Sequence, residues 1–223
     1  MDNRVPQDRI NRKRPFVQED YRLMSQIESK IQYALGRTFQ NKKYNEILNK
    51  PKILISPLSY LKMILHSAMY ANPIYPQRDW VEVIGFLIGK KEKHQVIVQD
   101  AFSAGHGSEA TVQITDFSFI TRIMENKPSD SFICGWYHSH PSYGLFMSSI
   151  DIETQRAWQQ HWKHAIAIVV DPTLISSVHY GIDVFRLDEN LEYFEENVTF
   201  ELKNFPPRSL LKIKTLIQEV QQQ

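Results

Sequence analysis

Cysteine is almost missing from this 223-residue chain, and long apolar runs are missing altogether. The single cysteine, Cys134, permits no disulfide within the chain, and its apolar neighbours favour a small buried thiol over a nucleophile. No apolar stretch approaches the roughly 20 residues that a membrane-spanning helix needs, and the polar N-terminus lacks the apolar region of a secretory signal. We therefore expect a cytoplasmic protein with no membrane partner.

An excess of charge of one sign is also lacking. Lys and Arg number 26 against 25 Asp and Glu, so the formal net charge is only +1. A chain without a strong basic field is not expected to bind nucleic acid. With 42% hydrophobic residues, the chain can bury one main core and still supply terminal helices.

The sequence divides into three parts. Residues 1–50 are polar and basic at first and then show helical spacing, which predicts a basic arm followed by an amphipathic helix. Residues 51–204 carry the pattern of a core domain. Residues 205–223 predict a C-terminal amphipathic helix, which either packs on its own domain or makes a homodimer.

Strand and helix patterns alternate through the core domain. Ser56 and Pro57 predict a helix start, with the serine as N-cap and the proline in the first turn. The glycine-rich segment from Ser103 to Ser108 predicts a mobile loop. Strands are expected at 53–55, 81–89, 94–102, 132–137, 165–170, 179–187 and 198–202, and helices at 57–71, about 117–124 and 149–161. This order predicts an α/β sandwich.

Two histidines stand directly after the strand expected at 132–137. Because His138 and His140 are two residues apart, an extended backbone points both imidazoles to the same side, where they can share one ion. Asp151, eleven residues after His140, can supply a third ligand. Three protein ligands leave one position for water, as catalytic zinc requires. Spacing alone leaves open that the histidines are ordinary polar residues at a strand end.

Ser148 and Asp151 also fit a second explanation. A serine followed three residues later by an acidic residue at a helix start is a capping pattern. The hydroxyl then accepts from a backbone N–H, and the carboxylate favours the positive end of the helix. The residue pattern therefore leaves both a helix cap and a functional role open.

The segment Gly-Trp-Tyr-His-Ser-His-Pro at residues 135–141, with Ser-Ser-Ile-Asp at 148–151, resembles the JAMM motif of the MPN+ family of zinc metalloproteases. The resemblance covers about residues 52–190 and is greatest to the family's deubiquitinating members in the proteasome lid. It implies the MPN fold, in which helices sandwich a mixed β-sheet. Ser142, Leu145, Phe146 and Met147 depart from the proteasomal pattern, so the substrate preference stays open.

The resemblance also implies roles for individual residues. His138, His140 and Asp151 match the ligands of one Zn²⁺ per chain. Glu82 matches the family's general base, and Ser148 matches the group that donates to the developing oxyanion. The loop that grips a modifier's C-terminal tail by strand addition corresponds to Ser103, Ala104, Gly105, His106, Gly107 and Ser108, although a flexible surface turn explains this segment equally well.

The implied activity is hydrolysis of the isopeptide bond between the tail of ubiquitin, or of a ubiquitin-like modifier, and a substrate lysine. The proteasome or another MPN protein is a candidate assembly partner. One alternative keeps the zinc chemistry but acts on conjugates of a small prokaryotic-type modifier or sulfur carrier. Another is a non-catalytic MPN scaffold, which the filled ligand positions disfavour. A zinc nucleobase deaminase is excluded because it needs a pair of cysteine ligands.

Overall fold

The computed structural model describes residues 53–107, 121, 123, 125, 127–188, 190–192, 194, 198–205 and 209–221. The arm and helix predicted for residues 1–50 lie outside these ranges, as does most of the helix predicted near residues 117–124. Of that helix, Thr121, Ile123 and Glu125 are helical, and the Ile123 side chain is buried.

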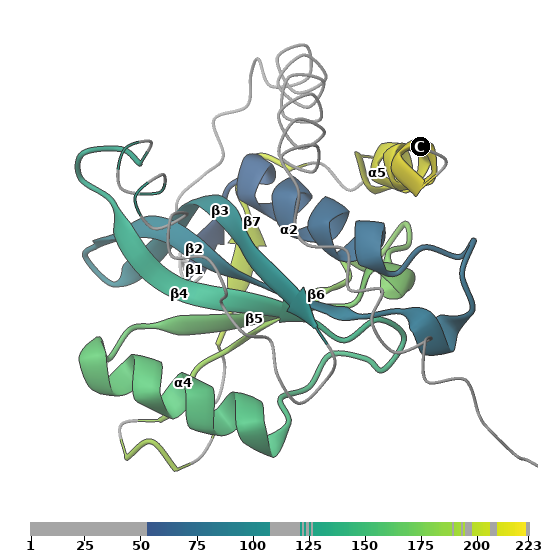
Figure 1. Ribbon diagram of the computed structural model, residues 1–223. Helices are drawn as coiled ribbons and strands as arrows, with labels where there is room; N and C mark the ends of the chain where they lie inside the picture. Colours follow the sequence, from purple (N-terminus) through teal and green to yellow (C-terminus); the bar gives the residue numbers. More distant parts are fainter. Residues whose placement is uncertain are drawn as a thin grey trace, which may run out of the picture.

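Seven strands of the described ranges form one mixed sheet (Figure 1) in the order β6-β5-β4-β2-β3-β1-β7. Long β2 pairs antiparallel with β3 and with β4, and β4 pairs parallel with β5. The bounds are β1 Ile53–Ile55, β2 Glu82–Glu92, β3 Gln95–Gly107, β4 Phe132–Ser139, β5 Ile166–Val170, β6 Ile182–Phe185 and β7 Phe200–Leu202. The α/β class predicted from the sequence is confirmed.

Helices cover both faces of this sheet. In Figure 1, α2 (Pro57–Tyr70) and α5 (Ser209–Gln221) lie above the sheet, and α4 (Ser149–His161) lies below it. Short 3-10 turns, η2 (Gln77–Asp79) and η3 (Pro172–Leu174), occur in connecting segments. The sandwich therefore places the main core between the sheet and α2, with a smaller apolar cluster between the sheet and α4.

The start of α2 follows the sequence signals. The Ser56 hydroxyl accepts a hydrogen bond from the Ser59 backbone N–H at 3.0 Å, and Pro57 occupies the first turn. Ten consecutive residues of the helix, 59–68, are buried, which is more than one amphipathic face would bury. The reason is that α2 is covered on its outer side as well.

The cover on α2 is the C-terminal helix α5. Its apolar face is buried in the main core through Leu210, Ile213, Ile217 and Val220. The Gln221 side-chain amide donates to the carbonyl oxygens of Ala68 and Ala71, at 3.0 and 3.2 Å. Of the two options left open by the sequence, packing of the helix on its own domain is therefore the one observed.

The predicted mobile loop at Ser103 is wrong for the residues that the structure describes. Ser103 to Gly107 continue strand β3, and Gly107 lies opposite Glu82 in the ladder with β2. Backbone hydrogen bonding to a long partner strand outweighs the local preference of a glycine-rich segment for a turn. Ser108, at the end of the predicted loop, lies outside the described residues.

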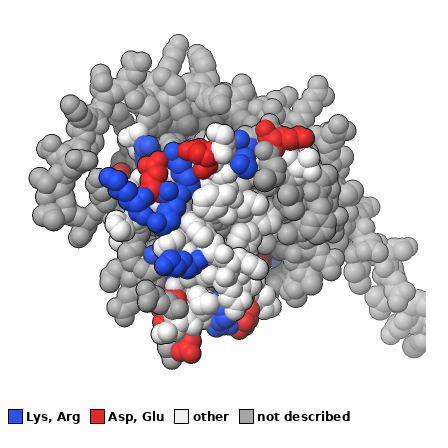
Figure 2. Space-filling model, turned by 90° about the vertical axis from the view of Figure 1, so that its left-hand side faces the viewer, with Lys and Arg blue, Asp and Glu red and all other residues white. Residues whose placement is uncertain are grey.

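The far end of β2 and β3 is a charged hairpin. Lys90 pairs with Glu92 at 2.8 Å and with Asp130 at 2.9 Å. Figure 2 looks onto the left-hand face of Figure 1 and shows basic and acidic side chains side by side along its upper part, without a continuous field of one sign. The helices of the described ranges are too short or too polar to span a lipid bilayer.

Candidate metal centre

Three elements bring their ends together at one edge of the sheet. Strand β4 carries His138 near its last residue, and His140 follows directly after the strand. Helix α4 carries Asp151 in its first turn. Strand β2 begins with Glu82, and its Ile84 pairs with His138. The convergence therefore depends on pairing between strands and on the docking of α4, neither of which is local in sequence.

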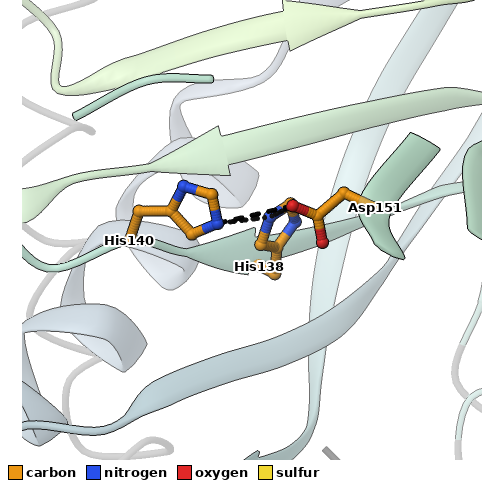
Figure 3. A group of neighbouring side chains, drawn as sticks. All are labelled: His138, His140 and Asp151. Carbon is orange, nitrogen blue, oxygen red and sulfur yellow. Dashed lines mark hydrogen bonds and ion pairs between the residues drawn. The ribbon is translucent and has the colours of Figure 1, made fainter. Parts of the chain in front are cut away.

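The two imidazoles and the Asp151 carboxylate point toward one another (Figure 3), and their candidate ligand atoms all lie within 4.8 Å of one another. The Nε2 atoms of His138 and His140 are 3.1 Å apart. Asp151 Oδ2 lies 3.2 Å from His138 Nε2 and 3.5 Å from His140 Nε2. One nitrogen from each ring and one carboxylate oxygen therefore face a common point.

These spacings fit a tetrahedral metal ion. Ligand bonds of about 2.0–2.1 Å in tetrahedral geometry put neighbouring ligand atoms about 3.3 Å apart. The three observed separations, from 3.1 to 3.5 Å, fall around that value. Two imidazoles and one carboxylate also form a donor set that suits zinc, and three protein ligands leave a position for water.

Burial, hydrogen bonds within the cluster and nearby carboxylates determine the ionisation of its three side chains. Burial lowers the pKa of His138, against the opposing effect of its hydrogen bond to Asp151. Burial alone would also lower the pKa of His140, but the hydrogen bond to Asp151 and the charges of Glu82 and Asp171 raise it. Although burial opposes ionisation of Asp151, hydrogen bonds from the two histidines hold its pKa well below the usual range. The aspartate is thus ionised and available as a ligand.

Trp136 and Gln155 hold the His138 side of the cluster. The Trp136 indole stacks on the His138 ring, with centroids 4.7 Å apart and planes 15° apart. Its Nε1–H donates to the Gln155 Oε1 at 2.9 Å, and the Gln155 amide donates in turn to Gln159 and to the Ala165 carbonyl. This buried chain of hydrogen bonds fixes α4, and with it Asp151, against the sheet.

Glu82 and Ser139 meet at the ends of β2 and β4. The Glu82 carboxylate lies 3.8 Å from His140 Nε2, and its side chain is only 14% exposed. The Ser139 hydroxyl, between the two histidines, accepts from the Val83 backbone N–H at 3.0 Å. This bond pins the residue after Glu82 to the residue between the candidate ligands. Sequence reasoning missed Ser139, because its partner is 56 residues away.

Ser148 forms the helix cap that the sequence left open. Its hydroxyl accepts from the Asp151 N–H at 3.2 Å, and its own N–H donates to Asp151 Oδ2 at 2.7 Å. A hydroxyl group can accept one hydrogen bond and donate another. The capping box orients the Asp151 carboxylate toward the histidines and leaves the Ser148 O–H proton available, so the two explanations are compatible.

The fold and the cluster of candidate metal ligands agree with the protein family that the sequence matches. The chain matches the family described as JAB1/Mov34/MPN/PAD-1 ubiquitin protease over residues 49–163, just over half of its length. The chain therefore belongs to this family, and its layered sheet and helices form the MPN fold. The resemblance to JAMM proteins drawn from the sequence motif is confirmed.

Individual relatives are identical to this chain at about one residue in three of the matched segment. COP9 signalosome complex subunit 5b of Arabidopsis thaliana is 34% identical over 142 residues, which are 60% of this chain and 37% of that protein. The 26S proteasome regulatory subunit RPN11 of Eremothecium gossypii is 34% identical over 143 residues, or 62% of this chain and 43% of that subunit. Ubiquitin carboxyl-terminal hydrolase RPN11 of Saccharomyces cerevisiae is 32% identical, with 62% and 44% covered. The chain thus spans about two fifths of the length of these relatives.

Proposed function

We propose that the protein is a zinc-dependent isopeptidase that hydrolyses the bond between the C-terminal tail of ubiquitin, or of a ubiquitin-like modifier, and a substrate lysine. The observation that carries the proposal is the meeting of His138, His140 and Asp151 with the Glu82 carboxylate 3.8 Å from one of them. A metal ion held beside a carboxylate can supply the activated water and the proton transfer that amide hydrolysis needs.

His138, His140 and Asp151 would hold one zinc ion. When bound, zinc supplies Lewis acidity toward a carbonyl oxygen and lowers the pKa of water to about 7. The Trp136 stack and the capping box keep two of these side chains in place in advance, which limits the reorganisation needed for binding. The ligand roles rest on this geometry and on the donor set.

Glu82 and Ser148 would move protons and stabilise charge. Glu82 accepts a proton from the attacking water and returns it to the departing lysine amine, so that one carboxylate serves as base and then as acid. The Ser148 hydroxyl, already fixed by its cap, donates its proton in a hydrogen bond to the developing oxyanion. No covalent bond to the protein forms, and the buried Cys134, whose pKa burial raises to about 12, takes no part.

Strand β3 would bind the modifier's tail. Ser103 to Gly107 are extended and lead directly to the position opposite Glu82. Gly105 and Gly107 carry no side chain, so a tail backbone can approach them closely. An extended tail hydrogen-bonded along Ser103–Ser108 would have its carboxyl end delivered to the cluster. The name of one relative, ubiquitin carboxyl-terminal hydrolase, supports a ubiquitin-type tail as the substrate.

Location and assembly follow as further parts of the proposal. Because named relatives are subunits of the 26S proteasome and of the COP9 signalosome, we propose a cytoplasmic protein that works with the proteasome or with another MPN protein. The division of the chain at residues 50 and 204 stays a prediction.

The test is cleavage of a panel of conjugates by the purified protein. The panel contains lysine conjugates of ubiquitin, of ubiquitin-like modifiers and of a small prokaryotic-type modifier, each with and without a chelator. We expect cleavage of a ubiquitin-type conjugate that chelation abolishes and zinc restores. Glu82→Gln should lose about 100-fold or more in rate, because it removes general acid-base catalysis.

A matched control lies at the other end of the same strand. Glu92→Gln changes the same side chain at the charged hairpin and should leave the rate unchanged. Cleavage that resists chelation would overturn the zinc mechanism. Zinc binding without cleavage of any conjugate would favour the non-catalytic scaffold, and cleavage of the prokaryotic-type conjugate alone would move the substrate to that class.

A further inference from the structure

The segment that joins His140 to Ser148 has an unusual backbone. Ser142 and Gly144 both adopt positive φ angles, of 64° and 97°. Such angles are disfavoured for a residue with a side chain, and Ser142 therefore needs compensating contacts. Both ends of this loop belong to the candidate site, so whatever fixes the loop also fixes the distance between a candidate metal ligand and the candidate oxyanion donor.

Asp171, the first residue after β5, makes two of the contacts that hold the loop, and a third is the hydrogen bond that Gln77 Nε2 donates to the Ser142 hydroxyl. Asp171 is 1% exposed, and its carboxylate accepts from the backbone N–H groups of Ser142 and Gly144, at 3.1 Å each. Thr173 adds two more bonds, from its N–H at 3.0 Å and its hydroxyl at 2.6 Å. The N–H between those of Ser142 and Gly144, that of Tyr143, donates instead to the His140 carbonyl at 3.1 Å, so the two amides bound by Asp171 flank a tight turn that begins at His140.

The same strand end also holds His140. The His140 N–H donates to the carbonyl of Val170, the residue before Asp171, at 2.9 Å. Beyond this turn, Phe146 lies against the His140 ring with centroids 4.7 Å apart, and Met147 is buried in the apolar cluster between the sheet and α4. The end of β5 thus holds the chain at His140, Ser142 and Gly144, in the loop that leads to Ser148.

We propose that Asp171 is a positioning residue of the hydrolytic site, which acts by clamping the loop that separates His140 from Ser148. The proposal rests on the proposed function, since it assigns the clamp to that reaction. Asp171 touches neither substrate nor metal in this role. Asp171 holds the loop so that the Ser148 hydroxyl and the Phe146 ring keep fixed positions relative to His138 and His140.

The test combines hydrogen exchange with kinetics on Asp171→Asn. The amide has one oxygen in place of two, so at least one of the N–H groups of Ser142 and Gly144 loses its acceptor. Exchange of at least one of these two amides should rise at least about tenfold, while exchange in α2 stays as in the unmodified protein. The value of kcat should fall about 10- to 100-fold with one zinc per chain retained.

Two further variants keep the test decisive. Asp188→Asn is the matched control, because Asp188 also accepts a backbone N–H, from Glu192 at 3.1 Å, in a loop outside the cluster. It should change neither kcat nor exchange at Ser142. Thr173→Val removes one of the four bonds and should shift both readouts in the same direction by less, which covers the case that Asp171→Asn fails to fold.

The outcomes separate this proposal from the proposed function. Unchanged exchange at Ser142 and Gly144, or a rise of equal size in α2, would overturn the clamp. A normal kcat with faster loop exchange would show that the clamp exists but does not position the site, which also overturns the proposal. If the unmodified protein cleaves no conjugate, the proposed function fails, and the exchange data still decide whether Asp171 holds the loop.

Discussion

At the scale of single residues, Ser148 and Asp151 show how one local motif can serve both folding and chemistry. The sequence pattern left a helix cap open as one explanation, and the structure contains both hydrogen bonds of a capping box. Because the cap uses the Ser148 oxygen only as an acceptor, the hydroxyl proton is still available to a substrate oxygen. The same cap turns the Asp151 carboxylate toward His138 and His140, so the start of α4 also orients one of the candidate metal ligands.

Removal of the Ser148 hydroxyl should therefore affect rate far more than stability. Ser148→Ala should lower the rate about 100- to 1000-fold, as expected for an oxyanion donor, and cost about 1 kcal/mol in stability for the lost cap. Ser56→Ala is the matched control, since Ser56 caps α2 by the same kind of bond. It also loses the bond that the Ser56 hydroxyl donates to the Gln99 carbonyl at 2.8 Å, so it should cost at least as much free energy of unfolding and no activity. Equal rates for the two variants would show that Ser148 is a cap only.

A second residue-scale prediction concerns the buried His66. Its Nδ1 lies 2.8 Å from the Tyr137 hydroxyl, and burial, with a smaller contribution from His106, lowers its pKa from 6.5 to about 3. Between pH 6.5 and pH 3, His66 binds a proton in the unfolded chain but stays neutral in the folded one. The free energy of unfolding that depends on His66 is therefore fully present above pH 6.5 and decreases as the pH falls toward 3. The contribution is at most about 1.4 kcal/mol per pH unit.

The measurement is urea unfolding of metal-free protein at about pH 6.5 and pH 5, compared with His66→Gln. The variant cannot titrate at this position, so its stability should fall less with acidification, by up to about 2 kcal/mol over this interval. Other titrating groups are shared by the two proteins and cancel in the difference. Equal losses in both proteins would mean that His66 is protonated in the fold.

At the scale of elements, the sequence predicted best those helices and strands whose position depends on neighbouring residues. The cap and proline of α2, the buried strand leading to His138 and the bounds of α4 all follow from neighbouring residues. The extension of β3 through Ser103–Gly107 was missed, because it depends on pairing with β2 across the hairpin. The same reason explains why Ser139 and Asp171 escaped notice: each fixes the site through a backbone group that lies far away in sequence.

Helix α5 gives a prediction at this scale, since it offers a buried and an exposed side chain two residues apart. Ile213 is 4% exposed in the main core, whereas Leu211 is 61% exposed. Ile213→Ala should lower the free energy of unfolding by about 2–4 kcal/mol, and Leu211→Ala should change it by about 0.5 kcal/mol or less. Urea unfolding of the two variants provides the check. Equal effects would mean that α5 does not pack on α2 in solution.

At the scale of the whole molecule, the chain is an MPN fold with its cluster of candidate ligands at one end of the central strands and a charged hairpin at the other. The matched segment covers less than half of each relative named above, so what the chain shares with them is the segment that carries the cluster. Every part of the proposed chemistry depends on whether this end of the sheet holds a metal ion.

The most direct measurement is the zinc bound per chain when metal-free protein is titrated at neutral pH. We expect one ion per chain, and we expect its loss in His138→Ala and Asp151→Ala, because two ligands do not complete a catalytic zinc site. His161→Ala, in the last turn of α4, is the control and should bind zinc as the unmodified protein does. A chain that binds no zinc, or that binds it equally well without His138, would contradict the account.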